Sequence, residues 1–130
     1  MTYGFKVKVE GDVPHAVEQV TNALQDEGFG VLTEIDVQAT LKKKLDIDRR
    51  PYRILGACNP ALAHRALETE PDIGLLLPCN VVVQEEEDGS TSVAFIDPDA
   101  MLSVVKRDDI KSLATEVRVR LEKVRDVVSV

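Results

Sequence analysis

One segment constrains the fold more than any other: residues 74–97, which read GLLLPCNVVVQEEEDGSTSVAFID. Two apolar runs flank Asp88-Gly89, a pair that suits the positive φ angles of a two-residue turn, so the segment predicts a β-hairpin. Pairing on that turn places Phe95 opposite Val82. Both strands are then polar near the turn and apolar on both faces away from it. Burial on both faces predicts helices on one side of the sheet and a second copy of the chain on the other.

Strand and helix periods alternate through the rest of the chain. The third strand ends at Cys58, and Asn59-Pro60 then supplies an N-cap and a first-turn proline, while Asp36 is the expected cap of an earlier helix. Strands are predicted over 3–10, 29–36 and 52–58, and helices over 12–28, 36–45, 60–70 and 109–128.

These elements fit within one domain, because a chain of 130 residues is of ordinary domain size. We therefore predict a single compact α+β domain over residues 1–130. Its mixed or antiparallel sheet has about five strands with helices packed on it. The β-hairpin at 80–97 and a long C-terminal helix are its clearest parts.

Composition excludes several classes of protein. The net charge is −7, so the protein and the negatively charged backbone of a nucleic acid would repel each other. Aromatic residues make up 4% of the chain and include no Trp for base stacking. No run approaches the roughly 20 apolar residues that cross a bilayer. The first residues lack the features of a signal peptide, so the sequence predicts a cytoplasmic protein that binds neither nucleic acid nor membrane.

Charge is segregated along the chain. Residues 42–53, KKKLDIDRRPYR, hold six basic and two acidic side chains, a local charge of +4 that leaves −11 on the remainder. This basic segment can receive an anion or the acidic face of a second subunit. The alternative is a solvated helix end, the usual place for a charge run.

The only two cysteines each precede an asparagine, in Cys58-Asn59-Pro60 and Pro78-Cys79-Asn80. Cys58 ends a predicted strand just before a helix N-terminus, where the unpaired N–H groups favour negative charge. We expect a thiolate there to have a depressed pKa. Ligands also settle at such strand ends in open α/β sheets.

Several interpretations of these four residues stay open. Cys58 and Cys79 can form a redox pair or part of a metal site, with His64 as a further candidate ligand, although their spacing matches no compact zinc motif. Cys58 alone can be a nucleophile, but no His-Asp arrangement lies nearby in the sequence. Asn59 and Asn80 can line a small-molecule pocket whose walls include the cysteines. Finally, buried cysteines can be apolar filler and Asn59 only a cap.

The segment YRILGACNPALAHRALETEPDIGLLLPCNVVVQEEEDGSTSVAFIDP resembles the centre of the domain-of-unknown-function family numbered 302. The pattern is a strand ending Gly-x-Cys-Asn-Pro, an alanine-rich helix, and Gly-x-x-Leu-Pro-Cys-Asn before a valine-rich strand. The matching residues are Gly56, Cys58, Asn59, Pro60, Gly74, Leu77, Pro78, Cys79 and Asn80. The resemblance implies a small α+β domain, commonly a homodimer, and brings no established activity.

The sequence thus favours a homodimeric ligand-binding module with candidate site residues Cys58, Asn59, Cys79 and Asn80. It names no cofactor, and the ligand is a small molecule or an anion. A structural or interaction protein without such a site is the alternative, and a thiol-based redox or metal-binding protein is the second. An enzyme ranks below a binding module.

Overall fold

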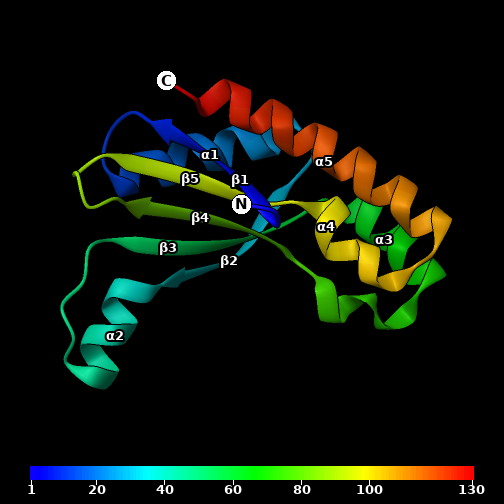
Figure 1. The fold of residues 1–130 in the computed structure, drawn as a ribbon, viewed down its shortest axis with the longest axis horizontal. Helices are drawn as coiled ribbons and strands as arrows, with labels where there is room; N and C mark the ends of the chain where they lie inside the picture. Colours follow the sequence, from blue (N-terminus) through cyan, green and yellow to red (C-terminus); the bar gives the residue numbers. More distant parts are fainter.

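The computed structural model describes all 130 residues and contains five strands among its helices (Figure 1). The strands are β1 (Gly4–Val9), β2 (Gly30–Asp36), β3 (Tyr52–Cys58), β4 (Cys79–Glu85) and β5 (Thr91–Ile96). The α-helices are α1 (Val13–Asp26), α2 (Val37–Leu45), α3 (Pro60–Thr69), α4 (Pro98–Leu102) and α5 (Asp108–Val128). Two short 3₁₀ helices are η1 (Pro71–Leu76) and η2 (Ser103–Val105).

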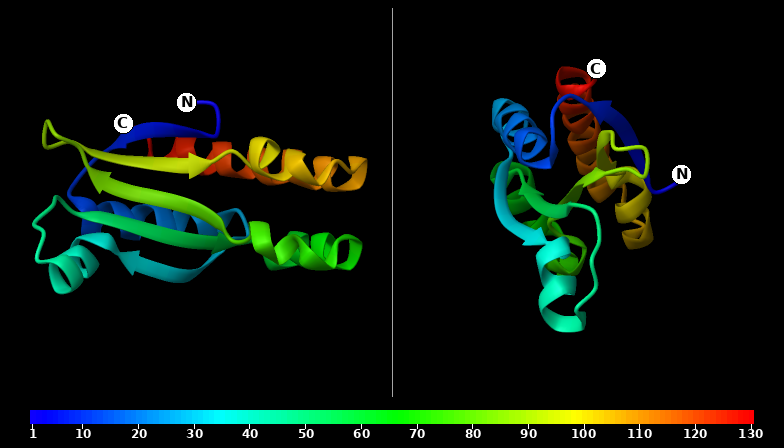
Figure 2. Two further views of the ribbon diagram at one scale, coloured as in Figure 1. Left: turned by 60° about the horizontal axis from the view of Figure 1, so that its bottom comes forward. Right: turned by 90° about the vertical axis from the view of Figure 1, so that its left-hand side faces the viewer.

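The strands form one sheet in the order β1-β5-β4-β3-β2, and every neighbouring pair is antiparallel. Helices α1 and α5 pack on one face of it, as both views of Figure 2 show. A core of fourteen buried residues lies between these two helices and the sheet. Thirteen of them come from α1, α5, β3, β4 and β5, and the fourteenth is Phe29. The predicted α+β fold with a five-stranded sheet is confirmed.

Helix starts follow the local sequence closely. The side chains of Asp12, Asp36 and Asn59 each accept a hydrogen bond from the backbone N–H three residues on, at 3.0, 2.9 and 3.3 Å. Such caps satisfy N–H groups that have no partner within the helix. The caps predicted at Asp36 and Asn59 are therefore confirmed.

The predicted hairpin is present, but its register was wrong by one residue. Phe95 lies opposite Val81, not Val82. The reason is the turn: Glu86 N–H donates to the carbonyl of Ser90, which closes a three-residue loop, and only Gly89 in that loop has a positive φ. A two-residue type I′ turn would need a positive φ at both central positions.

The corrected register decides which residues face the helices. Val81, Val83, Val93 and Phe95 are buried under α1 and α5, whereas Val82, which the strand alternation turns the other way, is only half-buried.

No helix crosses the other face of the sheet, which the left view of Figure 2 looks onto. We call this surface the open face; its apolar residues are Ile35, Ile54, Val82, Ala94 and Ile96. Ile35 is exposed and the other four are half-buried. Burial of the hairpin on both faces is thus not achieved within one copy of the chain.

A second apolar cluster lies beyond the end of the sheet, where α3, η1, α4 and the start of α5 come together (Figure 1). Its seven buried residues are Leu62, Ala66, Ile73, Leu102, Ile110, Leu113 and Ala114. The 3₁₀ helix η1 was not predicted; it carries the apolar run before Pro78, and β4 begins only at Cys79. None of the helices meets the length and apolarity that crossing a bilayer requires.

Candidate functional site

A cavity of about 40 Å³ lies where the two apolar clusters meet. Strand ends form one wall, and α3, η1, α4 and α5 supply the rest. Twelve of its fourteen lining residues are hydrophobic. The set is Phe29, Ala57, Cys58, Asn59, Leu62, Ala63, Ala66, Ile73, Leu77, Pro78, Cys79, Leu102, Leu113 and Val117.

Both cysteines line this one cavity. The ladder between β3 and β4 explains why: Cys79 pairs directly with Ala57, so it lies across from the residue next to Cys58. One cysteine ends its strand and the other begins the neighbouring antiparallel strand, so both reach the same end of the sheet. No disulfide joins them.

Asn59 contributes structure more than binding capacity. Its Oδ1 accepts from Leu62 N–H at 3.3 Å, and its Nδ2 donates to the carbonyl of Glu27 at 3.5 Å. Arg120 Nη1 donates to the same carbonyl at 3.1 Å. Both ends of the Asn59 amide are therefore occupied, and they tie the start of α3 to the end of α1 and to α5.

The structure separates Asn80 from the other three candidate residues. Asn80 is exposed on β4, and as the residue after buried Cys79 it points to the open face. It borders a shallow pocket there with Tyr3, Val82 and Ile96. The prediction that Asn59 and Asn80 line one pocket was wrong, because adjacent residues of a strand face opposite sides of the sheet.

His64 is exposed on α3 and does not line the cavity, so it does not join the two cysteines as a metal ligand. No group of three or more His, Cys, Asp or Glu side chains is arranged to hold a metal ion.

The pKa of each thiol is raised instead of depressed. Burial raises the pKa of Cys58, and burial followed by the proximity of Cys58 raises the pKa of Cys79 to about 11. The depressed pKa expected for Cys58 at a helix N-terminus was wrong, because desolvation by the apolar wall disfavours the thiolate. Both thiols are protonated at neutral pH.

Contacts within the chain occupy most of the basic segment 42–53. Lys42 pairs with Asp46 and Asp48 at 2.9 and 3.0 Å, and Arg53 pairs with Glu34 at 2.7 Å. The other two arginines are also engaged: Arg49 lies over the ring of Tyr52, and Arg50 donates to the carbonyl of Glu85. Lys43 and Lys44 alone have no such partner.

Sequence reasoning missed the distal wall of the cavity, which comes from η1, α4 and α5. Leu113 and Val117 lie on the apolar stripe of the C-terminal helix, so the stripe was visible in the sequence. The sequence did not show that this stripe packs against η1 and α4, because the segments that form these two short helices have no strong hydrophobic periodicity.

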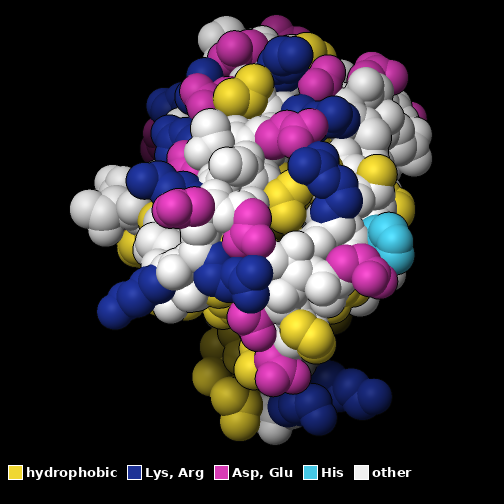
Figure 3. Space-filling view, turned by 90° about the vertical axis from the view of Figure 1, so that its right-hand side faces the viewer, with side chains coloured by type: hydrophobic (Ala, Val, Ile, Leu, Met, Phe, Trp, Pro, Cys, Tyr) yellow, Lys and Arg dark blue, Asp and Glu magenta, His cyan; other side chains and the backbone are white.

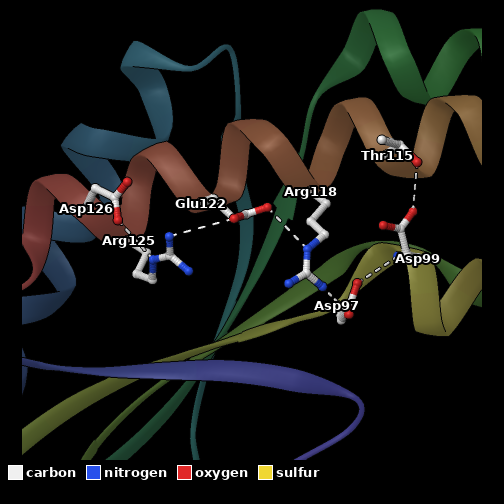
Figure 4. A network of polar contacts seen from close by, with 7 residues as sticks. All are labelled: Asp97, Asp99, Thr115, Arg118, Glu122, Arg125 and Asp126. Atoms are coloured by element: carbon white, nitrogen blue, oxygen red, sulfur yellow. Dashed lines mark hydrogen bonds and ion pairs between the residues drawn. The ribbon is translucent and has the colours of Figure 1, made fainter.

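A network of charged side chains holds that wall in place (Figure 4). Asp97 caps α4 by accepting from Asp99 N–H at 2.9 Å, and it also forms an ion pair with Arg118 of α5. Thr115 hydroxyl donates to Asp99 at 3.1 Å, and Arg118 donates to Glu122 at 3.2 Å. The short helix α4 is thereby fixed to α5 beside the cavity.

The buried thiol predicts a pH dependence of stability. Because the pKa of Cys79 is higher in the folded chain than in the unfolded one, the unfolded chain releases this proton first as the pH rises, and stability falls between about pH 9 and pH 11. The loss reaches about 3 kcal/mol for a shift of this size. Urea unfolding of wild type and Cys79→Ala across that range measures it. Only the wild type should show this component, and equal slopes for both proteins would contradict it.

Fold and cavity together define a class: small α+β proteins whose antiparallel sheet carries helices on one face and ends in a thiol-lined apolar cavity. The chain belongs to the family described as "Domain of unknown function DUF302", whose model matches residues 5–128.

Two similar proteins are informative about the fold. The crystal structure of an uncharacterized conserved DUF302 protein from Bacillus stearothermophilus superimposes with a TM-score of 0.91 at 29% identity, covering 98% of this chain and 99% of that one. An uncharacterized protein from Aquifex aeolicus (strain VF5) is 30% identical over 95 residues, which is 71% of this chain and 58% of that protein. The chain thus spans somewhat more than half the length of that relative.

Proposed function

We propose that this protein binds a small uncharged apolar ligand, or the apolar end of a larger one, in the cavity beside Cys58 and Cys79. One observation carries the proposal: both cysteines of the chain border a single cavity of about 40 Å³ whose lining is almost wholly hydrophobic. A polar cavity of this size would hold water, but an apolar one favours an apolar guest.

The chemistry of the lining selects the ligand class. The Asn59 amide already has its partners, and both thiols stay protonated because burial raises their pKa. A charged ligand would therefore be desolvated with nothing to pair with, which costs several kcal/mol. Binding fits this lining better than catalysis, since no base lies among the lining residues to activate a thiol.

The test uses straight-chain aliphatic alcohols from ethanol to octanol as probes, followed by NMR of the cavity-lining methyl groups. We expect saturable shifts that strengthen with chain length and then level off when the cavity is full. Ala63→Leu places a larger side chain on the cavity wall and should weaken binding by about tenfold, which is about 1.4 kcal/mol.

Ala61→Leu is the matched control, because Ala61 is exposed on the same helix and does not line the cavity. It should bind the probes as the wild type does. Shifts that never saturate, or that are equal in both variants, would overturn the proposal.

Thiol redox chemistry or metal binding is a less favoured proposal. The two cysteines are neighbours across the strand ends, but a raised pKa lowers the thiolate fraction that such chemistry needs.

We further propose that the chain forms a homodimer through the open face. A dimer of this kind would also suit the alternative function, an interaction protein without a small-molecule site. The observation is the apolar row Ile35, Ile54, Val82 and Ala94, which runs across four strands with no helix over it. Sedimentation equilibrium of the wild type tests the proposal, with a dimer expected at micromolar concentration. A monomer at that concentration would contradict it.

A further inference from the structure

Helix α2 packs differently from every other long helix of the chain. It begins after its cap Asp36 at the edge strand β2 and ends at Leu45, where Asp46 adopts a left-handed conformation. None of its nine residues is fully buried, and Val37, Gln38 and Leu41 are half-buried. It stands at the edge of the sheet, beside β2 and β3, as Figures 1 and 2 show.

The sequence of α2 is nevertheless amphipathic. Val37, Leu41 and Leu45 recur at fourfold spacing and so share one side of the helix, and Lys43 lies on the opposite side. Leu45 is 62% exposed, and Ile47, just after the helix, is 46% exposed. The projection at the bottom of Figure 3, where α2 lies, shows hydrophobic side chains on one side and Lys and Arg on the other.

We propose that α2 and the residues up to 50, together called the α2 arm, clasp a second copy of this chain, with Leu45 and Ile47 packed against the partner at the margin of its open face. This inference rests on the proposed homodimer. It adds the element that completes the interface and the residues that carry it.

Surface area supports an arm in addition to the sheet. Strands about 4.8 Å apart, with six residues each at about 3.4 Å, give the five-stranded face roughly 480 Å² in plan. A stable interface buries about 800 Å² on each partner. The exposed side of α2, about 14 Å long, lies next to the open face and adds to the surface that a partner can cover.

Charge favours a second copy as the occupant. On β1 the charges beside the open face are already neutralised, with Lys6 to Glu86 at 3.0 Å and Lys8 to Asp88 at 3.7 Å, so two identical faces meet without strong repulsion. Lys44, which flanks the apolar side of α2 next to Leu45, has no ion-pair partner in its own chain. An acidic partner suits it, and the chain outside residues 42–53 has a net charge of −11. In an isologous pair both arms make the same contact.

Sedimentation equilibrium of the full chain tests the arm with two variants. Leu45→Glu with Ile47→Glu should raise the dimer Kd by about 100-fold, because each substitution replaces an apolar contact with a charge that the partner surface would desolvate. Its thermal unfolding, measured on the monomer at low concentration, should stay unchanged because neither side chain is buried. Lys43→Glu is the matched control on the opposite side of α2 and should change Kd by less than about tenfold.

The outcomes separate the arm from the dimer itself. If the wild type and the double variant dimerise equally, the arm inference is wrong and the homodimer stands; Ile35→Glu on the open face should then still weaken the dimer. If Lys43→Glu weakens the dimer as much as the double variant does, the apolar contact is wrong. If the wild type is a monomer at micromolar concentration, both the homodimer and the arm are wrong.

Discussion

Gly56→Ala is expected to destabilise the folded chain by about 3 kcal/mol, at the upper end of what overpacking costs. A Cβ at this position would lie 2.3 Å from Thr33 Oγ1 and 2.8 Å from Pro78 Cγ. The hydroxyl can rotate, but the proline ring is rigid and immediately precedes Cys79. Relief therefore requires β3 and β4 to move apart at the end where the cavity begins.

Urea unfolding measures the effect, and Gly30→Ala is the matched control. Gly30 also lies on a strand, but a Cβ there meets nothing within 4 Å, so its change should stay within about 0.5 kcal/mol. Combining Gly56→Ala with Thr33→Ala should recover only part of the lost stability. The second substitution removes the contact with the Thr33 hydroxyl, but the contact with Pro78 remains. Equal stability of the two glycine variants would refute this account of Gly56.

The same displacement should weaken ligand binding, because Pro78 and Cys79 both border the cavity. Octanol affinity of Gly56→Ala, measured below its unfolding temperature, is expected to fall by about tenfold relative to Gly30→Ala. An unchanged affinity would show that the cavity does not depend on this contact.

Local sequence was enough to predict how the helices begin. Asp36 and Asn59 each precede an apolar helical stripe, and a side-chain cap depends only on the residues within one turn. The boundaries of β3 and the extent of α5 could also be predicted from local sequence, since the apolar pattern of each element is uninterrupted.

The hairpin register could not be fixed in this way. Gly89 takes a positive φ in a two-residue turn and in the three-residue loop that forms, so the Asp88-Gly89 pair is compatible with both. The strands did not decide between them, because Val81, Val82 and Val83 are equally apolar and a slip of one residue exchanges their faces.

The candidate site was predicted in part. The two Cys-Asn pairs are alike in sequence, but Asn59 follows its cysteine into a helix cap whereas Asn80 follows its cysteine along a strand. Strand alternation alone separates Asn80 from Cys79, so this division was available from the sequence. That the two cysteines meet was not, because it depends on β3 and β4 being neighbours with Ala57 opposite Cys79.

Helix α2 shows a different limit. Its apolar side is half-buried at Val37 and Leu41 but exposed at Leu45. A hydrophobic period indicates that a surface is covered but does not say by which chain. The second copy is therefore inferred from the exposed end of this side, at Leu45, and from Ile47 just after it.

Phe95→Ala is expected to lower the free energy of unfolding by about 4 kcal/mol. Phe95 is 1% exposed on β5, between β1 and β4, and its ring stacks on Phe5 at a centroid distance of 5.3 Å. Arg118 and Arg125 also lie over the Phe5 ring, with their Cζ atoms 5.3 and 5.5 Å from its centroid. Truncation thus leaves a cavity, removes an aromatic contact and loosens the strand on which α5 rests.

Val82→Ala is the control that tests the register as well as the core. With the three-residue loop, Val82 and Phe95 lie on opposite faces, and Val82→Ala should cost the monomer no more than about 1 kcal/mol. With a two-residue turn the two residues would be paired on one face, and both substitutions would open the same core. Urea unfolding of both variants at a concentration where the chain is monomeric separates these cases. If Val82 is covered by a second copy, its truncation should weaken the dimer while leaving the monomer folded, and a large loss of monomer stability would contradict both the register and the open face.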